Sequence, residues 1–429
     1  MNKRIPPNRY LLFGFAIIIL IGSLLLYLPF SQRDAADISY IDALFTSVSA
    51  VCVTGLVTLD VAATFSLFGR TIIAILILLG GMGFAAVIMS IVLVMGWDVG
   101  ISQRTILSEA YNLGTLRGTV RITKIVLLSS MIFQLVGTVL NFSVFIHHYH
   151  PIDALGHSVF HSISAFNNAG FDLMGNYSSL TGYSSNIMLN IVTMMLIVIG
   201  GLGFFVLSDI VSMHFNWKKL SMHTRIVLVM TTILIVIGTI GYSLIEHLGF
   251  LPSVFQSVTA RTAGFNTVDI GSLSTGSQFI TIVLMFIGAS PGSTGGGIKT
   301  TTTFAIFLSL SGLIRRRQPV AFNRKVPSES ITRAFQVLLL ALVTVTVGIM
   351  VISISEGERF SFMQTVFEVV SAYGTVGLST GITPVLGTIS KFVLMMVMFI
   401  GRLGPITVAT SLSARESVLK HIEERIFIG

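Results

Sequence analysis

Four glycines stand near the ends of four similar phrases in this sequence, and glycine in such a setting can help to coordinate a cation. The phrases are Ser-Ala-Val-Cys-Val-Thr-Gly-Leu (49–56), Ser-Ala-Phe-Asn-Asn-Ala-Gly-Phe (164–171), Val-Thr-Ala-Arg-Thr-Ala-Gly-Phe (258–265) and Ser-Ala-Tyr-Gly-Thr-Val-Gly-Leu (371–378). Their glycines, Gly55, Gly170, Gly264 and Gly377, are 115, 94 and 113 residues apart. Glycine adopts backbone torsions that a Cβ forbids, so such loops can turn carbonyl oxygens toward one axis and replace the water shell of an ion.

The two residues before each glycine complete the candidate coordinating set. They are Val53 and Thr54, Asn168 and Ala169, Thr262 and Ala263, and Thr375 and Val376. The fourth phrase is similar to the Thr-Val-Gly-Tyr core of the potassium-channel filter. Glycines can also serve only to let helices pack closely. Four of them, each at the end of a short apolar segment rich in small residues, favour a role in lining a pore.

Composition indicates where such loops lie. Hydrophobic residues make up 53% of the 429 residues and charged residues 10%, and the mean hydropathy is +0.88. A typical globular chain is about 25% charged, so an ordinary soluble enzyme and a disordered chain are excluded. The single cysteine, Cys52, excludes an intrachain disulfide and a cysteine metal cluster. The chain is predicted to be a polytopic membrane protein.

Eight apolar stretches are long enough to cross a bilayer, which takes about 20 residues of helix. They lie at 11–30, 67–96, 125–146, 186–213, 226–246, 278–314, 333–354 and 390–412, and the sixth is interrupted. Four shorter apolar pieces carry the glycine phrases and lie at 41–54, 154–169, 252–263 and 363–376. Each is too short to span the bilayer and is predicted to be a re-entrant helix.

The unit of span, half-helix, loop and span therefore repeats four times. The later spans repeat too, since Gly80-Gly81-Met82-Gly83-Phe84 matches Gly200-Gly201-Leu202-Gly203-Phe204. We predict an all-α polytopic membrane protein with four span–pore-loop–span repeats around a pseudo-fourfold pore. The repeats are expected at 1–96, 97–214, 215–314 and 315–414, followed by a C-terminal tail at 415–429.

Charge separates the connections between spans into two sets. The N-terminus, 97–124, 214–225, 315–333 and the tail carry 19 of the 26 Lys and Arg residues. The positive-inside rule then places both termini in the cytoplasm. The net charge of +8 is thereby explained by topology, and nucleic-acid binding gains no support from it.

The interruption of the sixth span, at 289–303, is rich in glycine and hydroxyl residues, and we call it the glycine-rich loop. A Walker A phosphate loop, Gly-x4-Gly-Lys-Ser/Thr, is one interpretation. Gly292 and Gly297 have that spacing, but Ile298 follows and Lys299 arrives one position late. No α/β pattern follows, and no nucleophile–base pair or His-Glu-x-x-His motif occurs. The sequence therefore predicts a protein that is not an enzyme.

With its four glycine phrases and the stretch 290–300, the sequence resembles the Trk/Ktr/HKT superfamily of cation transporters over nearly the whole chain. It looks most like the bacterial Ktr potassium-uptake membrane subunits (KtrB-like). The resemblance implies that the four glycines and the two residues before each form a K+ selectivity filter. In the family, glycine in all four filters accompanies potassium selectivity, and serine in the first accompanies sodium preference. This chain has Gly55 there.

The resemblance also implies that the glycine-rich loop is an intramembrane gate. The candidate gate residues are Gly292, Gly295, Gly296, Gly297, Lys299 and Arg402. Glycines permit the backbone change that a gate needs, and cations are costly inside a membrane unless they serve a function. Two roles for Arg402 stay open: an electrostatic part of the gate, or a structural tie to the carbonyl groups of the loop.

Three acidic residues, Asp42, Asp153 and Glu368, lie at or near the starts of the half-helices. Helix capping explains them, and a vestibule that concentrates cations is compatible with it. Asn167 and Asn168 are expected either to orient the second loop by hydrogen bonds or to face the ion vestibule.

The resemblance further implies partners and a location. It implies a homodimer embedded in membrane lipid of the bacterial cell membrane, a docked cytoplasmic nucleotide-binding ring (KtrA-like), and a tail packed at the dimer interface. A nucleotide would act only through that partner. The function expected is inward, channel-like K+ passage driven by the membrane potential, with Na+ as an activating ion. A carrier that couples K+ to Na+ or H+ remains the alternative.

Overall fold

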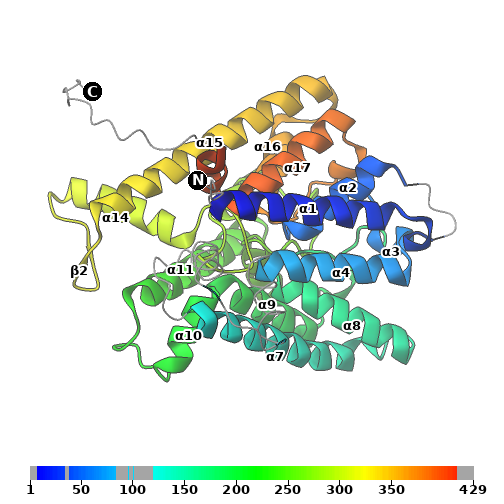
Figure 1. Ribbon diagram of the computed structural model, residues 1–429, viewed down its shortest axis with the longest axis horizontal. Helices are drawn as coiled ribbons and strands as arrows, with labels where there is room; N and C mark the ends of the chain where they lie inside the picture. The colour runs from blue at the N-terminus through cyan, green and yellow to red at the C-terminus, as the bar shows by residue number, and fades with distance from the viewer. Residues whose placement is uncertain (1–6, 34–37, 84–94, 96–99, 101–118, 413–429) are drawn as a thin grey trace.

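The computed structural model describes residues 7–33, 38–83, 95, 100 and 119–412, and this part of the chain is almost entirely helical. Figure 1 shows long helices running side by side, with shorter helices packed among them. Four times along the chain, a long helix is followed by a short helix, a loop and further helix. The fourfold pattern in the sequence is thus a fourfold pattern of structure, and the predicted fold class is confirmed.

The elements fall into four groups in chain order. The first two groups are α1 (Pro7–Tyr27), α2 (Tyr40–Val51), α3 (Val61–Thr64) and α4 (Leu67–Met82), then α7 (Thr119–Phe145), α8 (Pro151–Phe166), α9 (Ile187–Leu202) and α10 (Phe204–Ser212). The last two are α11 (Met222–Ile245), α12 (Phe250–Thr259), α13 (Thr275–Phe286) and α14 (Thr300–Ile314), then α15 (Ser328–Glu356), α16 (Phe362–Gly374), α17 (Thr388–Leu403) and α18 (Pro405–Leu412). Short 3-10 helices and one hairpin, β1 (Val320–Ala321) with β2 (Arg324–Lys325), complete the connections.

The short helices α2, α8, α12 and α16 match the four predicted re-entrant helices. Their 10 to 16 residues span at most about 24 Å, less than the hydrocarbon core of a bilayer. Local sequence starts them. The Ser39 hydroxyl accepts the backbone N–H of Asp42, Ser361 forms a capping box with Gln364, and Pro151 opens α8. Their direction into the molecule is therefore set at the first turn.

The long helices carry broad apolar faces that the protein leaves uncovered. On α7, Leu128, Met131, Leu135 and Val139 lie along one side and are 61–69% exposed. Four helices, α1, α7, α11 and α15, are each long and apolar enough to cross a membrane. A soluble protein does not leave apolar faces of this length in water, so these faces mark the contact with lipid.

Two of the predicted continuous spans are sharply bent. The axes of α9 and α10 differ by 93°, and those of α17 and α18 by 97°. The breaks lie at Gly203 and Gly404, where φ is +93° and +87°. Left-handed torsions end a helix, and glycine adopts them without a Cβ penalty. The prediction of one interrupted span was therefore too simple, because at least three spans are broken.

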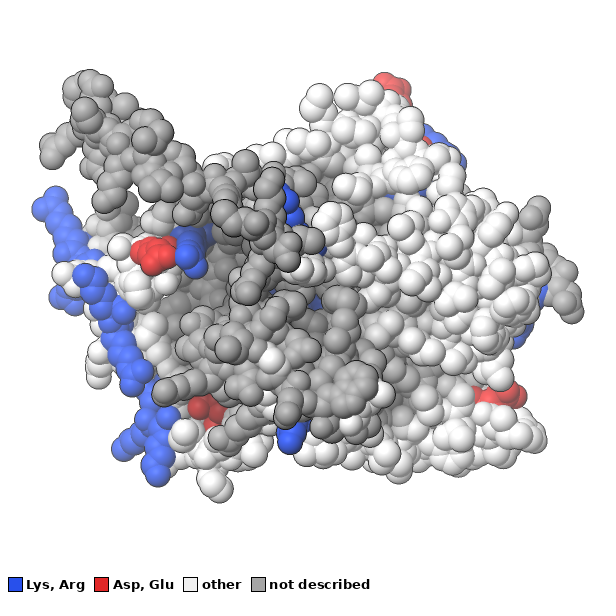
Figure 2. Space-filling view, viewed as in Figure 1, with Lys and Arg blue, Asp and Glu red and all other residues white. Residues whose placement is uncertain are grey.

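Basic side chains gather at one end of the molecule. Figure 2 shows Lys and Arg along one edge, at the end where β2 lies in Figure 1. The exposed cations of the α10–α11 and α14–α15 connections are Lys218, Lys219, Arg315, Arg316, Arg317, Arg324 and Lys325. This is the end that the charge pattern predicts to be cytoplasmic.

Candidate functional site: a ring of four loops above a glycine-rich loop

Each short helix ends inside the molecule and is followed by a loop with alternating backbone torsions. The residues two before the glycines, Val53, Asn168, Thr262 and Thr375, have φ of +53°, +56°, +73° and +49°. The glycines Gly55, Gly170, Gly264 and Gly377 have φ of +87°, +68°, +82° and +94°. The residue between them stays outside the left-handed region in all four loops. Alternation of this kind turns successive carbonyl groups toward one side, which is the geometry a backbone cation site needs.

The four glycines form a closed ring, which we call the glycine ring. At Gly170 an added Cβ would stand 2.8 Å from the carbonyl oxygen of Ala263, in the third loop. A Cβ added at Gly55 would stand even closer to the carbonyl oxygen of Ala169 in the second loop. The same holds for Gly264 and the carbonyl oxygen of Val376, and for Gly377 and that of Thr54. Every loop therefore touches the next in the order one, two, three, four, one, and the repeats surround a common axis.

Serines in the glycine phrases hold two of the loops. The Ser49 hydroxyl accepts the N–H of Gly55 at 3.0 Å, and the Ser371 hydroxyl accepts the N–H of Gly377 at 3.2 Å. Both serines lie six residues before their glycine, within the pore-facing end of a short helix. The Ser-Ala phrase shared by these repeats is thus a structural support for the loop.

A cavity of about 430 Å³ opens above the glycine ring, and we call it the outer cavity. All four ring glycines line it, together with the carboxylates of Asp60, Asp172 and Asp269. No Lys, Arg or His is among its lining residues in the described part of the chain. Burial, and to a lesser degree the charge of Asp60, raises the pKa of Asp172 to about 6. Because acidic side chains line the cavity and basic ones do not, the cavity has a negative field that suits a cation.

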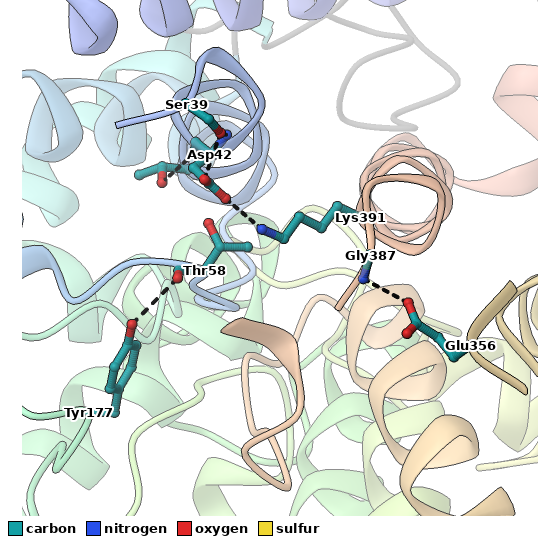
Figure 3. A network of polar contacts seen from close by, with 8 residues as sticks. Ser39, Asp42, Thr58, Tyr177, Glu356, Gly387 and Lys391 are labelled. Atoms are coloured by element: carbon teal, nitrogen blue, oxygen red, sulfur yellow. Dashed lines mark hydrogen bonds and ion pairs between the residues drawn. The ribbon is translucent and has the colours of Figure 1, made fainter. Parts of the chain in front are cut away.

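The acidic residues singled out from sequence do other work. Figure 3 shows Lys391 reaching from α17 to Asp42 on α2, with Nζ 2.7 Å from the carboxylate. Glu368 lies within α16 and accepts hydrogen bonds from Ser379, Thr380 and Thr383 beyond the fourth loop. Asp153 is exposed in the first turn of α8. None of the three lines the outer cavity. The aspartates that do line it were not predicted from the sequence, because they lie on connections that carry no motif.

Polar contacts join the repeats around the outer cavity. The Lys391–Asp42 ion pair ties the fourth group of helices to the first, and both side chains are at most 15% exposed. Tyr177 donates from its hydroxyl to the carbonyl of Thr58 at 3.4 Å, joining the second group to the first (Figure 3). Glu356 accepts the N–H of Gly387 at 2.7 Å and so holds the start of α17. These contacts fix the second and fourth groups relative to the first.

The glycine-rich loop lies against the other side of the ring. It runs from the end of α13 to Lys299, and residues 300–303, which the sequence grouped with it, form the first turn of α14. Its backbone is bonded to the second group, since Ser290 N–H donates to Gly201 and Phe204 N–H to Gly292. It also reaches the fourth loop, where Gly296 N–H donates to the Thr375 hydroxyl at 2.9 Å.

One glycine in each group of helices packs tightly against a backbone carbonyl, and comparing the four shows where the glycine-rich loop is inserted. Gly80, Gly200 and Gly401 each lie against the carbonyl at the end of their own short helix, at Val51, Phe166 and Tyr373. The corresponding glycine of the third group, Gly288, lies instead against the carbonyl of Gly296. The third group alone thus has the loop inserted where the others have direct helix-to-helix packing.

Two partly buried cations hold the loop. Arg402 donates from Nη1 to the carbonyl of Thr294 and from Nη2 to the carbonyls of Gly80 and Gly81. Lys299 donates from Nζ to Gly295 at 2.7 Å and to Gly296 at 3.3 Å. Arg402 therefore links the loop to the first and fourth groups, as the structural alternative expects, and it does so beside the axis.

The fold and the ring define a membrane protein whose four pore loops surround one central path. The chain belongs to the TrkH family of cation transport proteins, whose family model matches residues 15–418. Its helices superpose on the crystal structure of the potassium transporter TrkH from Vibrio parahaemolyticus with a TM-score of 0.74, at 19% identity, over 96% of this chain and 86% of that one. That likeness supports the four-repeat fold.

Relatives with full-length similarity are also known. The chain is 38% identical to Ktr system potassium uptake protein B of Bacillus subtilis, over 99% of this chain and 97% of the relative. It is 36% identical to potassium/sodium uptake protein NtpJ of Enterococcus hirae, over 100% of this chain and 98% of the relative. The predicted superfamily is confirmed, and the family is one of transporters rather than enzymes.

Proposed function

We propose that the chain is the potassium-translocating membrane subunit of a Ktr-type uptake system, with channel-like inward K+ passage. The observation that carries the proposal is the closed ring of four left-handed glycines. The names of two relatives that match over their full length, a potassium uptake protein and a potassium/sodium uptake protein, support K+ as the transported ion.

The proposed selectivity filter comprises the glycine ring and the residues before each glycine. These are Val53, Thr54, Gly55, Asn168, Ala169, Gly170, Thr262, Ala263, Gly264, Thr375, Val376 and Gly377. Carbonyl oxygens of four loops replace the hydration shell of K+, and the negative outer cavity raises the local concentration of cations. The short helices point their C-terminal, partially negative ends toward the path, which favours cations further.

The proposed gate is the glycine-rich loop, with Gly292, Gly295, Gly296, Gly297, Lys299 and Arg402 as its working residues. Support comes from its place against the ring and from bonds to three groups of helices. A polar loop across the path blocks K+, and glycines without side chains allow it to move. Arg402 then serves both roles, because the same guanidinium holds the loop and places a positive charge on the path.

The proposed assembly follows the Ktr pattern. The subunit acts as a homodimer in the bacterial cell membrane with both termini cytoplasmic, and a cytoplasmic nucleotide-binding ring (KtrA-like) controls the gate. The basic edge in Figure 2 is a surface on which such a ring can dock. Na+ is the proposed activating ion, and a nucleotide acts through the ring alone. The tail at 415–429, proposed for the dimer interface, lies outside the described residues.

Flux measurements in liposomes test the proposal. The full chain is reconstituted with and without the cytoplasmic subunit of a Ktr system, and K+ and Na+ fluxes are compared. Arg402→Ala, or deletion of 295–297, should raise flux without the cytoplasmic subunit and leave the K+/Na+ ratio unchanged. Arg33→Ala, which removes an exposed arginine between α1 and α2, is the control. Lower flux in both gate variants under all conditions would show that the loop is structural.

A coupled carrier is the second candidate, and the name potassium/sodium uptake protein of one relative favours keeping it. A channel-like path gives a K+ current that reverses at the K+ equilibrium potential, whatever the Na+ and pH gradients. A reversal potential that moves with either gradient would establish coupling instead.

A further inference from the structure

Three of the four residues at the inner end of the proposed filter have polar side chains, and all three meet the glycine-rich loop. We call Val53, Asn168, Thr262 and Thr375 the inner row. All four are fully buried and left-handed. A polar side chain buried in a membrane protein needs partners, and the partners in the inner row come partly from the loop.

Asn168 is the most connected member of the row. Its amide lies 3.1 Å from the hydroxyl of Thr294 in the loop and 3.2 Å from the hydroxyl of Thr262 in the third filter loop. In the orientation that satisfies both ends, the amide nitrogen donates to Thr294 and to the carbonyl of Phe166, and the amide oxygen accepts from Thr262. One side chain thus joins two filter loops and the glycine-rich loop.

Thr375 and Thr262 meet the loop's glycines. Thr375 accepts the N–H of Gly296 at 2.9 Å. A Cβ on Gly296 would collide with the Thr375 hydroxyl, and one on Gly295 with the Thr262 hydroxyl. Glycine at both positions is therefore what lets the loop's backbone reach the hydroxyl oxygens.

We propose that Thr375 is shared between the loop and the permeating ion, with Asn168 as the positioning residue that holds the loop beside it, so that K+ at the inner end of the filter weakens the loop's blocking position. This inference rests on the proposed filter and gate and adds the means by which they communicate. The Thr375 hydroxyl oxygen has two lone pairs, and when one of them accepts the N–H of Gly296, the positively polarised amide hydrogen repels a cation that approaches the other. Ion and loop therefore compete for the same Thr375 oxygen, and a bound ion favours release of the loop.

Hydroxyl variants test the shared contacts. Thr294→Val removes the loop's bond to Asn168 without touching the filter, and Thr375→Val removes the oxygen that both ligands use. Each should raise K+ flux without the cytoplasmic subunit about fivefold, the factor expected for one hydrogen bond of ordinary strength. Thr344→Val is the matched control, because that hydroxyl donates to the carbonyl of Leu340 within α15 at 2.8 Å and not to the loop or the filter. It should leave flux within about twofold.

Thiol labelling tests the competition independently of flux. In full-length protein carrying Ser293→Cys, a membrane-impermeant thiol reagent applied from the cytoplasmic side should react faster as K+ rises. Native Cys52 is fully buried, and the parent chain corrects for its labelling. With Thr375→Val added, labelling should be fast and independent of K+, whereas Thr375→Ser should restore the K+ dependence.

The outcomes separate the inference from the function beneath it. A labelling rate independent of K+ with Thr375 intact, or fluxes of Thr294→Val and Thr375→Val equal to that of Thr344→Val, overturns the shared contacts. If the shared contacts are overturned but deletion of 295–297 still raises flux, the glycine-rich loop is a gate that does not depend on those contacts. If the deletion leaves flux unchanged, the proposed gate falls, and the inference with it.

Discussion

Replacing one ring glycine by serine tests the proposed filter with a graded expectation. Serine adds a Cβ and a hydroxyl at positions where φ lies between +68° and +94°. The Cβ would stand 2.8 Å from the neighbouring carbonyl at Gly170, but closer at the other three glycines and closest at Gly377. Serine should therefore be tolerated best at Gly170 and worst at Gly377.

The magnitude has two contributions. A left-handed torsion costs a residue with a Cβ about 1–2 kcal/mol, and overpacking costs about 1–3 kcal/mol. Van der Waals contact at about 3.5 Å requires the carbonyl of Thr54 to move by about 1 Å in Gly377→Ser. A loss of about 1.4 kcal/mol in K+ binding is a factor of ten. We expect the K+/Na+ permeability ratio to fall about tenfold or more, and less in Gly170→Ser.

Reversal potentials in mixed K+ and Na+, measured on the reconstituted protein, give the ratio. Gly381→Ser is the control, because Gly381 has φ of +92° and lines the outer cavity, yet a Cβ there meets open space. It carries the torsional strain without crowding the ring. If Gly381→Ser changes the ratio as much as Gly377→Ser, or if Gly170→Ser is the most affected ring variant, crowding of the carbonyl ring is not what sets selectivity.

Three further expectations concern the outer cavity, the repeat contacts and the helix bends. The pKa of Asp172 is raised to about 6, so its carboxylate is neutralised as the external pH falls through 6, and the rate of K+ uptake should fall with it. In Asp172→Asn the rate of K+ uptake should be low at every pH and should not change between pH 5 and 7. Lys391→Met should lower the free energy of unfolding in detergent by about 2 kcal/mol, because the part-buried carboxylate of Asp42 loses its cation and keeps the hydroxyl of Ser39. Adding Asp42→Asn should recover part of this loss. Equal melting temperatures of the variants and the parent would contradict it. Gly203→Ala, whose Cβ would press on a carbonyl of the glycine-rich loop, should raise basal flux more than Gly404→Ala. The latter strains a similar torsion, but its Cβ would meet only the hydroxyl of Thr407, at 3.9 Å.

The repeat and the ring glycines are determined by the sequence alone. Each half-helix is a short apolar run with its own start and a glycine phrase at its end, and these are properties of adjacent residues. Val53 to Gly55 and Thr375 to Gly377 could be placed in loops at the ends of half-helices for that reason. The fold class follows as well, because a chain with 10% charged residues has no alternative to lipid around its helices.

Only the tertiary structure decided how these parts meet. Asp60, Asp172 and Asp269 line one cavity although they come from three connections, and Asn168 meets Thr294 across 126 residues of chain. The bend at Gly203 lies between apolar helices, so no change in polarity marks it. Hydropathy and motifs describe residues near one another in sequence, whereas a pore is built from contacts between repeats about 100 residues apart. Those contacts are set by packing around the axis, which no local pattern encodes.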